Sequence, residues 1–160
     1  MAKSDDWSTP PDLAAALYAE FGFTLEVAAA ADNRAIPKIP YMGLDNGQDA
    51  LTMPWGEKGD VMYCNPPYSQ LPAFITKAEH AAWHGPVVLL IPAYTDTKIW
   101  QFPIAHRAAE IRFLAGRIRF WDKEGPGKDT ARFPSAVVVF KPPFGVRSGG
   151  PAITFWDWRA

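Results

Sequence analysis

The chain has 160 residues, 48% of them hydrophobic, which is enough for one domain with a single core. Its single cysteine excludes an internal disulfide framework, and its apolar runs are too short to span a bilayer. We therefore expect one soluble, cytoplasmic domain over residues 1–160. The net charge is −1, but residues 1–97 carry 5 Lys and Arg against 12 Asp and Glu, whereas residues 98–160 carry 11 against 5. This asymmetry indicates either an anionic partner or a basic face that is merely solvated.

The first half of the chain is predicted to alternate helix and strand. A helix is expected over residues 10–21, because prolines stand at its start and Gly22 follows its end. Ser8 or Thr9 is the expected N-terminal cap of this helix. The remaining elements expected here are a buried strand at 23–28, an irregular stretch at 29–59 with a short strand near 39–42, and a strand at 60–64.

The second half is predicted to contain more strand than helix. The expected elements are a helix at 71–83, a fully buried strand at 86–92, a helix at 97–107 interrupted at Pro103, a strand pair at 109–114 and 117–121 that forms a hairpin, a polar loop at 122–133, a strand at 135–141 and an irregular tail at 142–160. This order predicts an α/β fold with a mixed sheet flanked by helices. Ligands of such sheets bind at the carboxyl ends of the strands.

The sequence Asn65-Pro66-Pro67-Tyr68 follows one predicted strand directly, and its chemistry suits methylation of an amino nitrogen. Such a nitrogen is planar and a poor nucleophile, so acceptors that grip its N–H groups help it to react. The Asn65 side-chain oxygen and the Pro66 carbonyl can be these acceptors. Pro67 restricts Pro66 to an extended conformation, and Tyr68 offers a flat face for a planar substrate. The alternative interpretation is a rigid turn without chemistry, and the four residues leave adenine, cytosine and glutamine open as substrates.

Several further segments, in order along residues 7–140, give the chain a family resemblance. They are WSTP at 7–10, TLEVAAA at 24–30, DAL at 49–51, CNPPYS at 64–69, VVLLIPAYTDT at 87–97, GRIRF at 116–120 and FPSAVVVF at 133–140. With these segments the chain resembles the phage and prophage family of small DNA N6-adenine methyltransferases. The resemblance implies a Rossmann-like methyltransferase fold, S-adenosylmethionine as cofactor, double-stranded DNA as partner and a flipped adenine as the site-specific target.

The resemblance also implies roles for individual residues. Asn65, Pro66, Pro67 and Tyr68 would be catalytic. The implied cofactor-binding residues are Trp7, Thr9, Pro10, Glu26, Ala28, Ala29, Asp49 and Asn65. The expected DNA-binding residues are Lys98, Arg117, Arg119, Lys123, Lys128 and Arg132, of which the two arginines would alternate on one face of a strand. No metal is expected, because the three histidines lack metal-ligand spacing with Cys64.

The chain departs from the family pattern at three places. Glu26 stands where Asp is more usual, alanines replace a glycine-rich turn, and Tyr94 stands where Arg is expected, although Lys98 could compensate. These departures keep a second hypothesis open, a catalytically degenerate methyltransferase fold that only binds DNA. A third is an amino methyltransferase that acts on RNA or on protein glutamine. The sequence indicates neither the DNA recognition sequence nor the oligomeric state.

Overall fold

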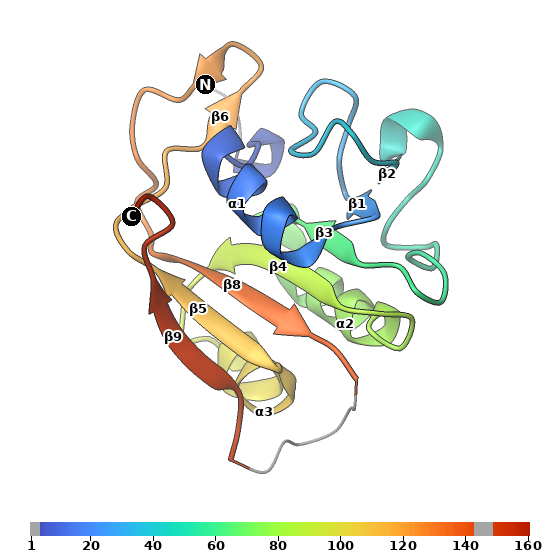
Figure 1. Cartoon of the computed structure of the whole chain (residues 1–160), viewed down its shortest axis with the longest axis vertical. Coiled ribbons are helices and arrows are strands. Elements are labelled where there is room, and N and C mark those ends of the chain that lie inside the picture. Colours follow the sequence, from blue (N-terminus) through green and yellow to red (C-terminus); the bar gives the residue numbers. More distant parts are fainter. Residues whose placement is uncertain (1–3, 143–148) are drawn as a thin grey trace.

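The computed structural model describes residues 4–142 and 149–160 and contains a seven-stranded sheet flanked by helices (Figure 1). The strands are β1 (Leu25–Val27), β2 (Tyr41–Met42), β3 (Met62–Cys64), β4 (Val87–Pro92), β5 (Glu110–Leu114), β6 (Trp121–Asp122), β7 (Gly125–Pro126), β8 (Ser135–Phe140) and β9 (Ala152–Trp156). The helices are α1 (Pro11–Phe21), α2 (Leu71–Ala81) and α3 (Ala105–Arg107), with shorter or irregular helical turns η1 (Ser4–Asp6), η2 (Leu44–Asn46), η3 (Tyr68–Gln70) and η4 (Trp100–Ile104). The predicted α/β class is confirmed.

The strand order of the main sheet is β2-β1-β3-β4-β8-β5-β9, and β6 and β7 form a separate small hairpin. Neighbouring strands are parallel except at β8, which runs antiparallel to both β4 and β5. Val27 lies opposite Cys64, and Cys64 lies opposite Leu89, so β1, β3 and β4 are in register. The segments that follow β1 and β3 therefore emerge side by side at the carboxyl ends of these parallel strands. This architecture is consistent with a Rossmann-like methyltransferase fold.

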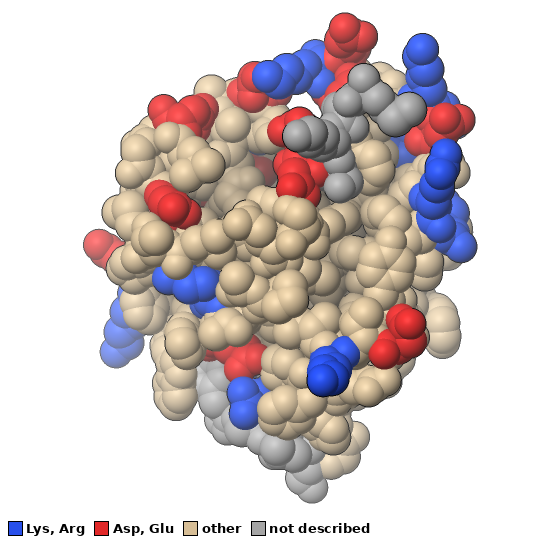
Figure 2. All heavy atoms as spheres, turned by 180° about the vertical axis from the view of Figure 1, so that it is seen from behind, with Lys and Arg blue, Asp and Glu red and all other residues tan. Residues whose placement is uncertain are grey.

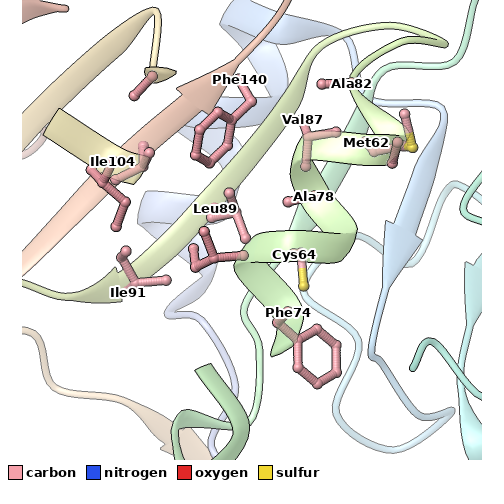
Figure 3. Packing of buried hydrophobic residues seen from close by; sticks show 14 of the residues in the cluster. Met62, Cys64, Phe74, Ala78, Ala82, Val87, Leu89, Ile91, Ile104 and Phe140 are labelled. Carbon is pink, nitrogen blue, oxygen red and sulfur yellow. The ribbon is translucent and has the colours of Figure 1, made fainter. Parts of the chain in front are cut away.

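The strands β4 and β8 are buried along their whole length, as their unbroken apolar sequences predict. One face of the sheet is covered by α2, whose Phe74 and Ala78 pack over Cys64 and Leu89 (Figure 3). The opposite face is covered by α1, which lies in front of the sheet in Figure 1. Two apolar layers thus hold β3 rigidly in place, and β3 is the strand that ends at Asn65.

The predicted hairpin between residues 109–114 and 117–121 is wrong. The strand β5 forms as expected, but it pairs with β8 on one side and with β9 on the other, so neither edge is free for residues 117–121. Ile118 and Phe120 point into the core all the same. The small hairpin forms instead from β6 and β7, within the stretch that we expected to be a polar loop.

The irregular tail predicted over residues 142–160 is also wrong in its described part. Residues 152–156 form β9, which runs parallel to β5 at the edge of the sheet. The prediction failed because the partner of β9 lies about forty residues earlier in the chain, and only the alternation of apolar residues marked the segment as a strand. Ile153 and Phe155 remain exposed at this edge.

The helix α1 ends at Gly22 as predicted, with this glycine in the left-handed conformation (φ 63°). The predicted N-terminal cap of α1 is wrong, because neither the Ser8 nor the Thr9 hydroxyl contacts the N-terminus of the helix. The Ser8 hydroxyl donates to the Asn33 carbonyl, and the Thr9 hydroxyl pairs with the hydroxyl of Tyr63 at 2.6 Å. Ser8 thus connects the N-terminal segment to the loop that follows β1, and Thr9 connects it to β3. The predicted interruption of the later helix does occur, one residue early, at Phe102.

Candidate active site

Asn65 directly follows β3, at the carboxyl ends of the parallel strands β1 and β3. Its side-chain nitrogen Nδ2 donates to the Trp7 carbonyl at 3.3 Å. Its side-chain oxygen Oδ1 is buried and has no hydrogen-bond partner among the described residues. A buried acceptor without a partner costs about 1–3 kcal/mol, so an arrangement that keeps one suits a site that receives a donor from a ligand.

Tyr68 begins η3, three residues after Asn65, and its ring meets two other aromatic rings edge-on. The ring centroids lie 6.2 Å from Phe120 and 5.6 Å from Phe133. Burial raises the pKa of the Tyr68 hydroxyl well above its usual range, so this group stays protonated and donates to the Leu90 carbonyl at 3.5 Å. The hydrogen bond and the two ring contacts therefore fix the position of the Tyr68 ring.

Trp7 completes this group of rings by stacking on Phe120, with centroids 5.2 Å apart and planes inclined by 18°. We call Trp7, Tyr68, Phe120 and Phe133 the aromatic cluster. Tyr94, which is 46% exposed, meets the outer side of the cluster through Phe133. We did not predict Phe120 or Phe133 as site residues. The signal that could have found them is an aromatic residue in each of two segments that carried the family resemblance.

A narrow cavity lies directly beside Asn65. It is lined by Asp5, Trp7, Ser8, Thr9, Glu26, Val27, Ala28, Ala29, Asn33, Ala35 and Asn65. Six of the predicted cofactor-binding residues are among them, and Pro10 and Asp49 are not. The only charged residues of the lining are Asp5 and Glu26, so the cavity is suited to a ligand that carries positive charge.

The turn after β1 shapes one wall of this cavity. Ala28 adopts a left-handed conformation (φ 59°), which is uncommon for a residue other than glycine, asparagine or aspartate. Its methyl side chain leaves the backbone of the turn open to close approach. Alanines thus do here what glycines do in a glycine-rich turn, at some cost in backbone strain.

A second, larger cavity of about 410 Å³ adjoins the narrow one and shares Ser8, Thr9, Asn33 and Ala35 with it. Its other side is formed by the hairpin of β6 and β7. The Lys123 ammonium on this hairpin lies 2.8 Å from the Asp32 carboxylate, so an ion pair joins the hairpin to the loop that follows β1. A volume of this size is within the usual range of small-molecule sites.

A comparison with known families identifies the family to which the chain belongs. The model of the family "DNA N-6-adenine-methyltransferase (Dam)" matches residues 1–151. The chain belongs to this Dam family. A protein described as "DNA N-6-adenine-methyltransferase" from Escherichia phage T1 is 32% identical over 115 residues. That match covers 71% of this chain and 46% of the phage protein, so the chain spans about half the length of this curated relative.

Membership of the Dam family confirms the resemblance seen in the sequence and implies a methyl donor. The roles of individual residues stay predictions. Asn65 lines the narrow cavity, and Tyr68, three residues later, packs in the aromatic cluster with Trp7, whose carbonyl accepts the Asn65 hydrogen bond. Pro66 is buried between them, and Pro67 is extended (φ −58°, ψ 119°) where it leads into η3.

Glu26 holds the loop that follows β1 as well as lining the cavity. Its two carboxylate oxygens accept hydrogen bonds from the backbone N–H groups of Ala35 (2.7 Å) and Ile36 (3.0 Å). Burial raises the pKa of this carboxyl above its ordinary value, although both hydrogen bonds act in the opposite direction. The longer reach of Glu compared with Asp is thus used to fix a loop of the site.

The raised pKa of Glu26 predicts how stability depends on pH. A carboxyl whose pKa is higher in the folded than in the unfolded state binds its proton more tightly when folded, and each pKa unit is about 1.4 kcal/mol. Its contribution is therefore complete below the unfolded-state pKa and is lost as pH rises through the folded-state pKa. We expect the stability of the wild type relative to Glu26→Gln to fall over this window, measured by urea unfolding at a series of pH values. A relative stability that rises over this window would show that the two amide hydrogen bonds outweigh burial.

Asp49 lines neither cavity, and its carboxylate instead accepts the Leu51 N–H of its own turn at 2.9 Å. The acidic residue next to the carboxyl end of β2 is Asp45, in η2. Its carboxylate accepts from the Ala31 N–H and from the Tyr41 hydroxyl. Asp45 was not among the residues predicted from the sequence. Asp45 and Asp49 both lie in the irregular stretch at 29–59, and only the position of β2 distinguishes them.

The predicted DNA-binding residues are spread over three segments. Lys98, Lys128 and Arg132 are exposed, and Lys123 is paired with Asp32. Arg117 and Arg119 are both exposed, but the strand that was to carry them does not form. Within the described residues neither forms an ion pair with Asp122 or Glu124. On the face drawn in Figure 2, basic side chains are interleaved with acidic and uncharged ones.

The described part of the chain contains neither a candidate metal cluster nor a candidate membrane-spanning helix. No group of three or more His, Cys, Asp or Glu residues in it is arranged to hold a metal ion. Likewise, none of its helices has the length and apolar character needed to cross a membrane.

Proposed function

We propose that the chain transfers a methyl group from S-adenosylmethionine to the exocyclic N6 of an adenine that is flipped out of double-stranded DNA. The observation that carries the proposal is the unpaired, buried Oδ1 of Asn65, three residues before Tyr68, in a chain of the Dam family. An adenine amino group is the matching donor. It has two N–H groups, is attached to a flat ring and is too weak a nucleophile to react unaided.

The cavity beside Asn65 supports S-adenosylmethionine as the methyl donor. This cofactor supplies an electrophilic methyl group on a positively charged sulfur. The acidic lining by Asp5 and Glu26 suits that charge, and the Ala28 turn allows close approach of the cofactor to the backbone. We propose Trp7, Thr9, Glu26, Ala28, Ala29 and Asn65 as the residues that hold it.

The catalytic work of the chain is to orient the amino group. Asn65 Oδ1 accepts one of its N–H groups and the Pro66 carbonyl accepts the other, which shifts electron density onto the nitrogen. Tyr68 stacks on the adenine ring, and this contact is worth about 1–3 kcal/mol. Stacking thereby offsets the few kcal/mol needed to flip a base out of the duplex.

The exposed cations Arg117, Arg119, Lys128 and Arg132 are the proposed phosphate contacts. Lys98 is exposed on the segment that follows β4 and belongs to the same set. Lys123 is a weaker candidate, because a DNA phosphate would have to compete with Asp32 for it. Each lost phosphate contact should reduce the slope of the logarithm of the DNA-binding constant against the logarithm of the salt concentration by about one.

The decisive experiment incubates the protein with unmethylated DNA and cofactor that carries a labelled methyl group. Nucleoside analysis of the product should show label in N6-methyladenine, and Asn65→Ala protein is the matched negative control. Label in cytosine, in RNA or on a glutamine of a protein would keep the amino-group chemistry but overturn the substrate. Absence of transfer to all of these would overturn the activity.

The second candidate is a DNA-binding protein with an inactive methyltransferase fold. It is favoured by one observation: both oxygens of Glu26 are already engaged by loop amides. Calorimetry with S-adenosylmethionine separates the two candidates, since the active enzyme must bind the cofactor. Binding without transfer would favour the inactive fold, and binding with transfer would exclude it.

A further inference from the structure

Residues 5–9 cross the carboxyl ends of β1 and β3, where Asn65 lies, and we call them the N-terminal strap. The strap contacts the Asn65–Tyr68 turn at both ends. At one end, the Trp7 carbonyl accepts the Asn65 Nδ2 hydrogen bond. At the other, the Asp5 carboxylate accepts from the Ser69 backbone N–H at 3.2 Å and from the Ser69 hydroxyl at 2.5 Å. Ser69 directly follows Tyr68, so the strap brackets the whole turn.

The strap also makes hydrogen bonds and a ring contact with parts of the chain outside the Asn65–Tyr68 turn. Ser8 exchanges two backbone hydrogen bonds with Trp121, of 2.8 and 3.0 Å, and its hydroxyl donates to the Asn33 carbonyl. The hydroxyls of Thr9 and Tyr63 lie 2.6 Å apart in the core. The ring of Trp7 is held by stacking on Phe120. The carbonyl and the carboxylate that meet the turn are thus presented by a fixed frame.

The contact with Trp7 decides which end of the Asn65 amide faces the substrate. A backbone carbonyl can only accept, so it pairs with the Nδ2 end of the amide and repels the Oδ1 end. Rotation of the amide by half a turn would place two oxygens together and would turn a donor toward the substrate amino group. The strap therefore selects the orientation in which the acceptor is free.

Asp5 acts on the same turn from the side of Tyr68. Its carboxylate receives two donors from one residue, and hydrogen bonds to a charged acceptor are stronger than those between neutral groups. Tyr68, the first residue of η3, is also held by its hydrogen bond to Leu90 and by its contacts with Phe120 and Phe133. Asp5 adds the contact that fixes the backbone of η3 next to Tyr68.

We propose that Asp5 is a positioning residue for methyl transfer: it holds Ser69, and through Ser69 it sets the place of Tyr68 opposite the Asn65 amide. This proposal rests on the proposed function for its effect on rate, but the contact itself exists in the protein without cofactor. Asp5 touches neither reacting atom. Its carboxylate also lines the cavity, so loss of its charge should weaken cofactor binding, whereas loss of its contact with Ser69 should lower the rate of transfer.

The test compares Asp5→Ala with Asp5→Asn, which keeps a group able to contact Ser69, and with Asp12→Ala, an exposed acid of the same N-terminal region whose carboxylate contacts only its neighbour Leu13. We expect Asp5→Ala to lower kcat about tenfold, as misplacement within a site does, whereas any weakening of the calorimetric Kd for S-adenosylmethionine should be shared by Asp5→Asn, which loses the same charge. Asp5→Asn should restore most of the rate, and Asp12→Ala should behave as wild type. Adding Ser69→Ala to Asp5→Ala should cost little more, because both changes break the same contact.

A second measurement does not depend on activity. In protein labelled with ¹⁵N-serine, hydrogen exchange of the Ser69 amide should be faster in Asp5→Ala than in wild type or Asp12→Ala, with Ser69→Ala identifying the signal. If exchange accelerates but no protein transfers methyl groups, the contact stands and the proposed function fails. If exchange is unchanged, or if Asp5→Ala weakens cofactor binding while kcat is kept, the positioning role of Asp5 is overturned.

Discussion

Replacing Asn65 by Ala should lower kcat for methyl transfer by about 10²–10³-fold, the range found when one acceptor or donor that stabilises a transition state is removed. The side-chain oxygen that is buried without a partner disappears, and the amino nitrogen loses one of its two proposed acceptors. The loss should be seen mainly in kcat, measured with labelled cofactor on unmethylated DNA, because the acceptor acts on the reacting nitrogen.

Asn46→Ala is the matched control for this change. Unlike Asn65, Asn46 uses both ends of its amide, accepting from the Gly43 N–H and donating to the Tyr41 carbonyl, and it lines neither cavity. This variant should lose some stability and keep its turnover. Asn65→Asp is informative as well: it keeps an acceptor but brings a carboxylate against the Trp7 carbonyl, and we expect activity between that of wild type and Asn65→Ala. Full activity of Asn65→Ala would eliminate the proposed role of the amide.

Tyr68→Ala should have the second large effect, because it removes the surface on which the adenine is proposed to stack. The loss of roughly 1–3 kcal/mol of stacking corresponds to a fall of about 5- to 150-fold in kcat/KM. Tyr68→Phe keeps the ring and loses only the 3.5 Å hydrogen bond to Leu90, so it should retain most of the activity. Steady-state kinetics on an adenine-containing duplex separates the two variants.

The cluster around Tyr68 makes a stability control necessary. Its ring contacts Phe120 and Phe133, so Tyr68→Ala will also lower the melting temperature. Tyr18→Ala removes a half-buried tyrosine that packs against the same apolar layer but lies on α1. If both variants lose similar stability and only Tyr68→Ala loses activity, the effect is on the site. Equal losses of activity would mean that unfolding explains both.

Much of the fold could be predicted because its signals are local. The apolar runs that became β4 and β8, the spacing of apolar residues in α2 and the glycine after α1 each lie within one element. The order of strands in the sheet was not predictable in this way. The strand β5 pairs with β8 and β9, which follow it by twenty residues or more, and a short connection after β5 made a hairpin the simpler expectation.

In the candidate site, too, the features with local signals could be predicted and those that depend on long-range contacts could not. Four consecutive residues, Asn65 to Tyr68, were predictable because their chemistry is contained in their order. Phe120, Phe133 and Asp5 were not, because each reaches the turn from a distant part of the chain. The cap proposed for α1 failed for a related reason: Thr9 has a partner in Tyr63, fifty-four residues away, which the sequence does not reveal.

The aromatic cluster has a consequence for the time at which the protein becomes competent during synthesis. Its four rings come from the beginning, the middle and the last third of the chain, and Trp7 stacks on a residue more than a hundred positions later. A ribosome-bound chain that has exposed Asn65 and Tyr68 but not Phe133 lacks the wall against which they are set. Such a fragment has the complete four-residue motif but not the complete aromatic cluster, so the proposed methyl transfer to DNA should begin only after Phe133 has emerged and packed.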